Sequence, residues 1–198
     1  MSIIWQYAWQ ALFALVIVGA LVTMIPIIAA FMKQVKLDKA RIWFKETEIF
    51  EEQQSRLAAH EERILGTLVY WKNKAAAHHR LHSASVIWSL ISAVSLPVLV
   101  QFYDANDTWS VAFLTAMTVF SGFVVALSHA LKSEEMSRGF RECESDYYDC
   151  ARALLDNPAN TVDERNTQVD KFIETVRAIR MAGRKVETNR PPSGLNWP

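Results

Sequence analysis

Charge is absent from two long parts of this chain. Residues 1–32 contain no charged side chain, and residues 83–131 contain only Asp104 and Asp107. All other members of the 21 Lys and Arg and the 21 Asp and Glu residues fall in residues 33–82 and 132–198. A water-soluble core of this size does not need uncharged stretches of such length. The pattern predicts a membrane protein, and the even balance of charge gives no support to a general nucleic-acid binder.

Cysteine, proline and glycine are also scarce, with two, six and six residues in a chain of 198. Cys143 and Cys150 cannot bridge within one helix, because seven residues separate their Cα atoms by about 10 Å and a disulfide needs less than about 7 Å. The sequence has no nucleophile elbow, phosphate-binding glycine loop or paired-Cys motif. We therefore expect a protein that is not an enzyme, with no catalytic residue, no metal and no cofactor.

Three apolar runs stand out, Gln10 to Met32, Ser83 to Tyr103 and Thr108 to Leu131. At about 1.5 Å per helical residue, each run reaches the thickness of about 30 Å of a hydrocarbon layer. The polar residues 104–107 between the second and third runs predict a tight turn. The sequence thus predicts three transmembrane helices, of which the last two form a hairpin.

The direction of the three runs follows from the positions of Lys and Arg. Segments 33–82 and 132–198 are rich in these residues, whereas residues 1–9 and the turn at 104–107 have none. Basic residues beside membrane spans are retained in the cytoplasm. We expect the amino terminus outside the cytoplasm and the carboxyl terminus inside it.

The charged segments have helical patterns. Residues 37–82 predict one long helix that continues into the second apolar run, with Gly66 as a possible break. After the third run, apolar residues alternate four and three positions apart: Met136, Phe140, Cys143, Tyr147, Cys150 and Leu154. This heptad spacing is typical of a helix that packs along another helix, and it favours self-association.

A further, short helix is expected after Asn157 and Pro158, because proline cannot continue the helix that carries the heptad spacing. Thr161 lies three residues before Glu164, which is the spacing of a capping box. The predicted inner face of the helix comprises Val169, Phe172, Ile173, Val176 and Ile179. The sequence from Gly183 onward predicts a flexible tail.

These patterns together predict an all-α membrane protein whose three transmembrane helices continue into a cytoplasmic helical bundle. The expected segments are an N-terminal transmembrane helix at 1–36, a cytoplasmic helix at 37–82 and a transmembrane hairpin at 83–131. Two C-terminal helices follow at 132–182, and a tail occupies 183–198.

Each helix of the predicted hairpin has a face of small or polar residues. These are Ser85, Ser89 and Ser92 in the second run, and Thr115, Thr118, Gly122 and His129 in the third. One interpretation is close helix packing, for which small residues and hydroxyls are the usual material. The other is that one face lines a water-filled path when several copies assemble. The sequence leaves both open.

Two weaker patterns lie in the charged segment before the hairpin. His78 and His82 share a helix face at a spacing that can bind metal, but no nearby carboxylate or Cys completes the set. A basic segment that holds phospholipid headgroups is the favoured interpretation. Arg56 and His60 are similar to the pairs of helical ribonucleases, although a solvated helix face explains them better.

Several motifs resemble the SLATT group, which are two-transmembrane effectors associated with nucleotide-generating and nucleotide-sensing proteins in bacterial conflict systems. They are Tyr70-Trp71, the run Ala75 to Arg80, Pro97 in the serine-rich span, Lys132, Phe140-Arg141 and the acidic helix to Leu154-Leu155. The resemblance covers roughly residues 70–155. This chain departs from the group's layout because it has an additional span before the hairpin.

The resemblance implies a homo-oligomeric effector in the bacterial inner membrane. Such a protein forms or gates a pore and permeabilises the membrane in antiphage defence. The expected partners are the lipid bilayer, other copies of the chain, and a cytoplasmic nucleotide- or RNA-sensing partner or a nucleotide second messenger. Candidate contacts for the phosphates of a signal or of lipids are Lys72, Lys74, Arg80, Arg138 and Arg141. A non-conducting scaffold that recruits a defence partner is the alternative.

Overall fold

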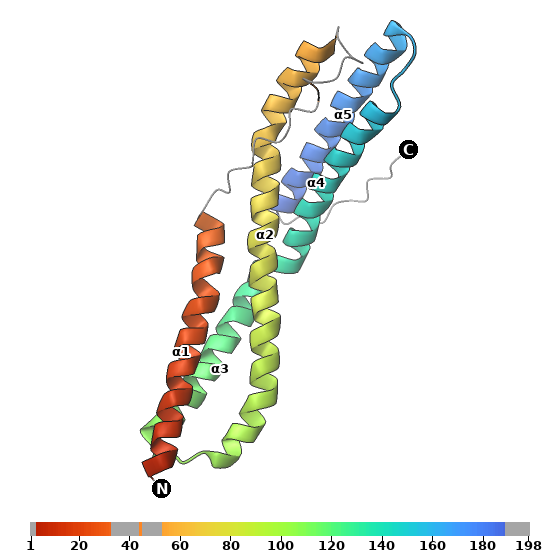
Figure 1. Ribbon diagram of the computed structural model, residues 1–198. Coiled ribbons are helices and arrows are strands. Elements are labelled where there is room, and N and C mark those ends of the chain that lie inside the picture. Colours follow the sequence, from red (N-terminus) through yellow and green to blue (C-terminus); the bar gives the residue numbers. More distant parts are fainter. Residues whose placement is uncertain (1–2, 33–43, 45–52, 189–198) are drawn as a thin grey trace. The chain divides into compact units, whose positions relative to one another are not determined.

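The computed structural model describes residues 3–32, 44 and 53–188, with side chains from Tyr7 onward. Its elements are α1 (Ile3–Met32), α2 (Gln54–Leu99), the 3-10 helix η2 (Val100–Phe102), α3 (Thr108–Ala130), α4 (Ser133–Asp156) and α5 (Val162–Glu187) (Figure 1). No strand occurs in these described ranges. The predicted all-helical fold is confirmed.

The chain divides into two compact units. Unit 1 comprises residues 1–33 and 77–134, and unit 2 comprises residues 34–76 and 135–198. Helix α2 is 46 residues long and contributes its first half to unit 2 and its second half to unit 1. Gly66 does not break this helix, and a Cβ atom added at Gly66 would have no neighbour within 4 Å. Of the long helix expected over residues 37–82, the part before Gln53 lies outside the described helices.

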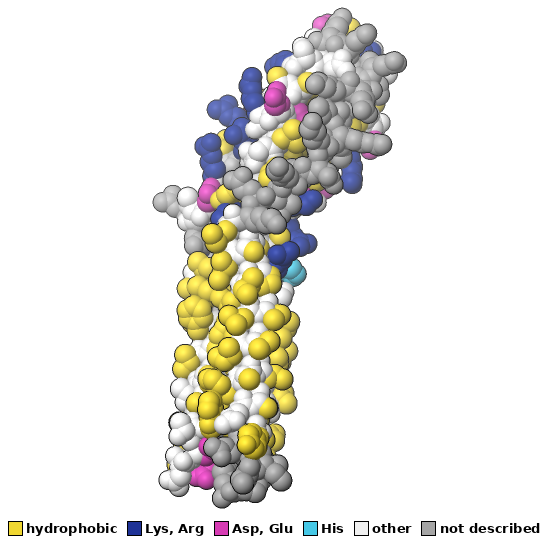
Figure 2. All heavy atoms as spheres, turned by 60° about the vertical axis from the view of Figure 1, so that its left-hand side comes forward, with side chains coloured by type: hydrophobic (Ala, Val, Ile, Leu, Met, Phe, Trp, Pro, Cys, Tyr) yellow, Lys and Arg dark blue, Asp and Glu magenta, His cyan; other side chains and the backbone are white. Residues whose placement is uncertain are grey.

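Three helices of the structure are long and apolar enough to cross a membrane, namely α1 from Tyr7, α2 with η2, and α3. Figure 2 shows many hydrophobic side chains on the visible face of unit 1. Leu15, Val94 and Val119 are 69%, 73% and 65% exposed. Because so much apolar surface is unfavourable in water, unit 1 suits the hydrocarbon of a bilayer.

Two clusters hold the helices of unit 1 together. In one, Trp9 and Val16 of α1 pack against Phe113 and Met117 of α3. In the other, Ile27 of α1 joins Leu81 and Ala84 of α2 and Val124 of α3. Lipid tails are as apolar as these side chains, so the packing depends on close van der Waals contact and hydrogen bonds rather than on the hydrophobic effect.

The predicted tight turn between the second and third apolar runs is confirmed. The backbone N–H of Asp107 donates to the Asp104 carbonyl at 3.1 Å. The Asp107 side chain caps α3 by accepting from the Trp109 N–H at 3.2 Å. The buried Ser110 hydroxyl donates to the Asp104 carbonyl at 2.7 Å, so this turn is fixed to the first turn of α3.

In unit 2, the first half of α2 packs with α4 and α5 around one core. The apolar stripe of α4 is buried at Phe140, Cys143, Tyr147 and Leu154 and half-buried at Met136 and Cys150. Its partners include Leu57, Ile64, Leu68 and Trp71 of α2 and Val169, Phe172, Val176 and Ile179 of α5. The stripe therefore has its partner within the same chain. The heptad spacing was the sequence-based argument for self-association. Because the stripe is buried within the chain, it no longer supports that prediction.

The start of α5 has the N-cap bond of the predicted capping box. Helix α4 ends at Asp156, just before Asn157 and Pro158, and Thr161 is the N-cap of α5. The Thr161 hydroxyl oxygen accepts from the Glu164 backbone N–H at 3.3 Å. The predicted inner face is also confirmed, with Ile173 partly buried and its other four residues fully buried.

The end of α5 differs from the prediction. The sequence predicted a flexible tail from Gly183, but the helix continues to Glu187. Gly183 and Val186 are both buried in unit 2. A Cβ atom at Gly183 would lie 2.7 Å from Cζ2 of Trp71, so only glycine lets the helix approach the indole this closely. The rest of the expected tail, from residue 189, lies outside the described residues.

Candidate functional site

The serine face of α2 is divided between the inside and the outside of unit 1. Ser85 and Ser92 are buried, whereas Ser89 is exposed. The Ser85 hydroxyl donates to the His82 carbonyl of its own helix at 2.7 Å. The Ser92 and Ser121 hydroxyls hydrogen-bond at 2.5 Å across the contact between α2 and α3. Ser92 thus takes part in packing between helices of one chain, whereas the bond of the buried Ser85 stays within α2.

On α3, all four candidates from the sequence are exposed: Thr115, Thr118, Gly122 and His129. The Thr118 hydroxyl donates to the Leu114 carbonyl at 2.8 Å, which satisfies it without water. A Cβ atom at Gly122 would have no neighbour within 4 Å. This face of α3 is available to lipid or to another copy of the chain.

The sequence interpretation missed the buried polar face of α3. Its serines are Ser110, Ser121 and Ser128, and the apolar residues Phe113, Met117 and Val124 lie between them on the same buried face. The serine at 121 pairs with Ser92, as described above. A signal was present, because all the buried positions recur three and four residues apart. The periodicity is hard to recognise in the sequence because serines and apolar residues share this face.

The sequence interpretation also missed Trp88, which joins all three helices of unit 1. Its indole N–H donates to the Thr23 hydroxyl of α1 at 3.2 Å, and Thr23 donates to the Gly19 carbonyl at 2.7 Å. A Cβ atom at Gly19 would lie 3.3 Å from the Trp88 ring. On α3, the ring of Phe120 contacts Trp88 edge to face at 4.7 Å between centroids. Trp88 therefore fixes α1 and α3 against α2.

The basic candidates are mostly solvent-accessible. Lys72, Arg80, Arg138 and Arg141 are exposed. Lys74 is half-buried, with its ammonium 5.7 Å from the centre of the Tyr70 ring. Arg80 belongs to unit 1 and the other four to unit 2. Figure 2 shows Lys and Arg side chains on the visible face of unit 2.

The two histidines with metal-compatible spacing occupy different environments. His78 is buried, and its ring contacts Phe31 of α1 edge to face at 5.3 Å. His82 is half-buried, and its carbonyl accepts from Ser85. Among the residues that the structure describes, no group of three His, Cys, Asp or Glu side chains could hold a metal ion.

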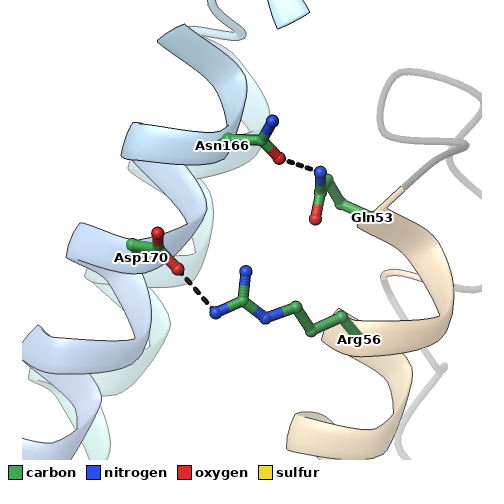
Figure 3. Close-up of polar contacts among 4 residues, drawn as sticks. All are labelled: Gln53, Arg56, Asn166 and Asp170. Carbon is green, nitrogen blue, oxygen red and sulfur yellow. Dashed lines mark hydrogen bonds and ion pairs between the residues drawn. The ribbon is translucent and has the colours of Figure 1, made fainter. Parts of the chain in front are cut away.

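Arg56 and His60 both face α5 within unit 2. Arg56 forms an ion pair with Asp170 at 2.6 Å, and beside it Gln53 bonds Asn166 (Figure 3). The His60 ring contacts Phe172 at 5.9 Å between centroids. Burial, and then the charges of Arg180 and Arg63, lower the pKa of His60. An uncharged, half-buried His60 at neutral pH suits packing against Phe172, whereas Arg56 is an exposed ion-pair partner of Asp170.

The two cysteines are free and belong to the core of unit 2. Burial, followed by the charges of Asp146 and Glu142, raises the pKa of the Cys143 thiol to about 11. Burial also raises the pKa of Cys150. Both thiols remain protonated at neutral pH, so neither is an activated nucleophile.

Within the described part of unit 1, polar and aromatic side chains connect the helices of a single chain. The hydroxyls of Ser92 and Ser121 bond each other, and Trp88 is buried in contact with Thr23 of α1 and Phe120 of α3. Ser89 and Thr118, by contrast, are exposed on the surface of unit 1. Comparison of the chain with protein-family models, curated proteins and solved structures found no match.

Proposed function

We propose that this chain is an oligomeric effector of the bacterial inner membrane. It forms or gates a pore in antiphage defence when a cytoplasmic partner linked to nucleotide or RNA sensing signals infection. The supporting observation is that α2 is one unbroken helix shared by the charged unit 2 and the apolar unit 1. A signal that binds two states of unit 2 unequally would shift the membrane segment through this helix.

The orientation in this proposal follows from the distribution of charge. The hairpin turn at 104–107 carries no Lys or Arg, and unit 2 carries most of those in the chain. Basic segments beside spans are retained in the cytoplasm. Unit 2 accordingly lies in the cytoplasm, where it can meet its partner, and the turn lies outside.

Assembly supplies the pore in this proposal. The exposed small and polar residues of the hairpin are Ser89, Thr115, Thr118, Gly122 and His129. Small residues and hydroxyls on membrane helices favour helix association. In an oligomer these residues either form the contacts between copies or face the water path between them.

Conductance in phage-challenged cells tests the proposal. Cells that carry the chain together with its signalling partner should lose membrane potential after infection, as measured with a potential-sensitive dye. Ser89→Leu with Thr118→Leu should reduce the depolarisation, because a pore loses polar lining or an intersubunit contact. Val119→Leu is the control, since Val119 is an exposed apolar residue of α3 next to Thr118. An intact potential in infected cells, or equal effects of the variant and the control, would contradict the pore.

A non-conducting scaffold is the second candidate. The hydroxyls of Ser92 and Thr118 favour a scaffold, because both form hydrogen bonds within a single chain and need no water-filled path. A scaffold would lose function when surface residues of unit 2 are replaced, and it would tolerate Thr118→Leu. Protection from phage with no loss of potential would support this second candidate.

A further inference from the structure

Negative charge gathers on the outer side of α4 in unit 2. Residues 142–156 hold five Asp or Glu and only one basic residue, Arg152. Three of the carboxylates are exposed and spaced by four and three residues, and we call them the acidic row: Glu142, Asp146 and Asp149. This spacing places them on one side of the helix. Burial, and then the charges of Glu142 and Asp149, raise the pKa of Asp146. The row therefore repels itself, and a nearby cation would stabilise it.

Positive charge gathers on α5. Residues 171–185 hold five Lys or Arg and only one acid, Glu174. Three of the cations are spaced by three and four residues, and we call them the arginine row: Arg177, Arg180 and Arg184. Arg180 is half-buried and the other two are exposed. Met181 is 52% exposed and lies four residues after Arg177, on the same side of the helix. Met and Arg are enriched at the contacts between proteins.

Neither row is neutralised by its own chain. In the acidic row, Asp149 lies 3.9 Å from Arg152 of the same helix, and both groups are exposed. The other members of the two rows form no ion pair within the part of the chain that the structure describes. Arg63 of α2 adds positive charge near the arginine row, because after burial the charges of Arg180 and Arg63 both lower the pKa of His60. Both rows are thus available to a partner of opposite charge.

The two rows lie at about the same level of unit 2. Helices α4 and α5 lie side by side and run in opposite directions (Figure 1). The Tyr147 ring contacts Phe172 at 6.4 Å between centroids, and a Cβ atom at Gly139 would lie 2.8 Å from Cγ2 of Val186. These two contacts enclose the first two residues of the acidic row on α4 and the whole arginine row on α5. When two copies of unit 2 stand side by side with parallel helices, the acidic row of one therefore meets the arginine row of the other.

The complementary rows favour a second copy of the chain as the partner. A phosphate-bearing ligand would use the arginine row but would leave the acidic row without a partner. Opposite charges across an interface fix its register and exclude wrong partners. Each copy carries both rows, so the contact is heterologous, repeats from copy to copy and closes where the rotation permits a ring. Exposed ion pairs are individually weak, but confinement of the copies to one membrane raises their effective concentration.

We propose that the arginine row of α5 docks on the acidic row of α4 in a second copy of this chain. Met181 becomes buried within this contact. The proposal deepens the proposed function, because it names a contact that builds the oligomer. It rests on the oligomeric part of that function but not on conduction, and the contact involves unit 2 alone.

Energy transfer between labelled copies in vesicles measures this association. The exposed Ala105 is replaced by Cys in a full chain whose own cysteines are substituted, and copies labelled with donor and acceptor are mixed in phosphatidylcholine vesicles. The measured quantity is the protein-to-lipid ratio at half-maximal transfer. An exposed ion pair changes an association constant about two- to fivefold. Loss of two pairs should therefore raise this ratio at least about fourfold.

Two charge-reversal variants carry the test. Arg177→Glu with Arg184→Glu reverses the arginine row, and Glu142→Arg with Asp146→Arg reverses the acidic row. Each variant alone should need the higher ratio, because it places like charges across the contact. An equimolar mixture of the two should return to within about twofold of the natural chain, because the reversed row of each variant then meets an opposite charge on the other. Variants that failed to fold would not recover on mixing.

Lys171→Glu is the control for charge alone, because Lys171 is exposed on α5 but lies outside the arginine row. It should change the ratio less than about twofold. The proposal is overturned if either reversal associates as the natural chain does, or if the mixture stays as weak as its components.

One outcome would assign the arginine row to a different ligand. Unchanged association, together with binding of inorganic phosphate that Arg177→Glu with Arg184→Glu removes, would overturn the contact in favour of a phosphate-bearing ligand. If the natural chain associates and the reversals have no effect, the oligomer of the proposed function stands without this contact. If the natural chain does not associate at any ratio, both the contact and the oligomeric part of the proposed function are wrong.

Discussion

Replacing Gly183 by Ala tests the close approach of α5 to α2. The added Cβ would lie 2.7 Å from Cζ2 and 2.8 Å from Nε1 of Trp71. The indole is only 3% exposed, so it has little room to move away. Overpacking of this kind costs about 1–3 kcal/mol. The higher helix propensity of Ala offsets about 0.8–1 kcal/mol of that cost.

Gly66→Ala is the matched control. Gly66 also lies within a helix of unit 2, but it is exposed, and a Cβ atom added there would have no neighbour within 4 Å. This variant gains the propensity term of about 0.8–1 kcal/mol without overpacking. The difference between the two variants therefore isolates the overpacking term, about 1–3 kcal/mol.

The assay is thermal unfolding of both variants in the same detergent, followed by far-UV circular dichroism at one heating rate. A change of 1 kcal/mol shifts the unfolding temperature of a chain of this size by about 2–4 °C. Gly183→Ala should therefore unfold at least about 2 °C below Gly66→Ala. Equal unfolding temperatures, or a higher one for Gly183→Ala, would refute the close packing of Gly183 on Trp71.

Two further predictions concern unit 2. Thr161→Ala should lower the stability by about 1 kcal/mol in the same unfolding assay, because α5 loses its N-cap, whereas Thr161→Ser should not. Iodoacetamide should alkylate Cys143 slowly in a Cys150→Ser variant, since a pKa of about 11 leaves about one thiol in a thousand ionised at pH 8. The rate should rise about tenfold per pH unit between pH 8 and pH 10 while the chain stays folded. Fast, pH-independent alkylation of the folded chain would contradict the burial of Cys143.

Much of unit 2 was predictable from the sequence, because water separates its inner and outer faces by polarity. The heptad stripe of α4 and the inner face of α5 both lie in the core as predicted. The cap at Thr161 follows from a local hydrogen bond, which depends on spacing alone. The end of α5 was not predictable, because the contact of Gly183 with Trp71 joins positions far apart in the sequence.

The inner faces of unit 1 were harder to predict. Lipid tails are as apolar as Leu, so a membrane helix does not reveal its buried side by polarity. Ser89 and Ser92 look equivalent in the sequence, yet only Ser92 is buried and finds a partner on α3. The bond from Trp88 to Thr23 depends on the position of α1, which no local spacing in the hairpin specifies.

The topology of the membrane crossing is tested most directly by labelling single cysteines with a membrane-impermeant maleimide. Ala105 in the hairpin turn and Ala153 on α4 are both exposed, so each can be replaced by Cys in a chain whose own cysteines are substituted. In spheroplasts with an intact inner membrane, Ala105→Cys should be labelled at once, and Ala153→Cys only after the membrane is permeabilised. Labelling of Ala153→Cys in intact spheroplasts, or protection of Ala105→Cys, would contradict three crossings with unit 2 in the cytoplasm.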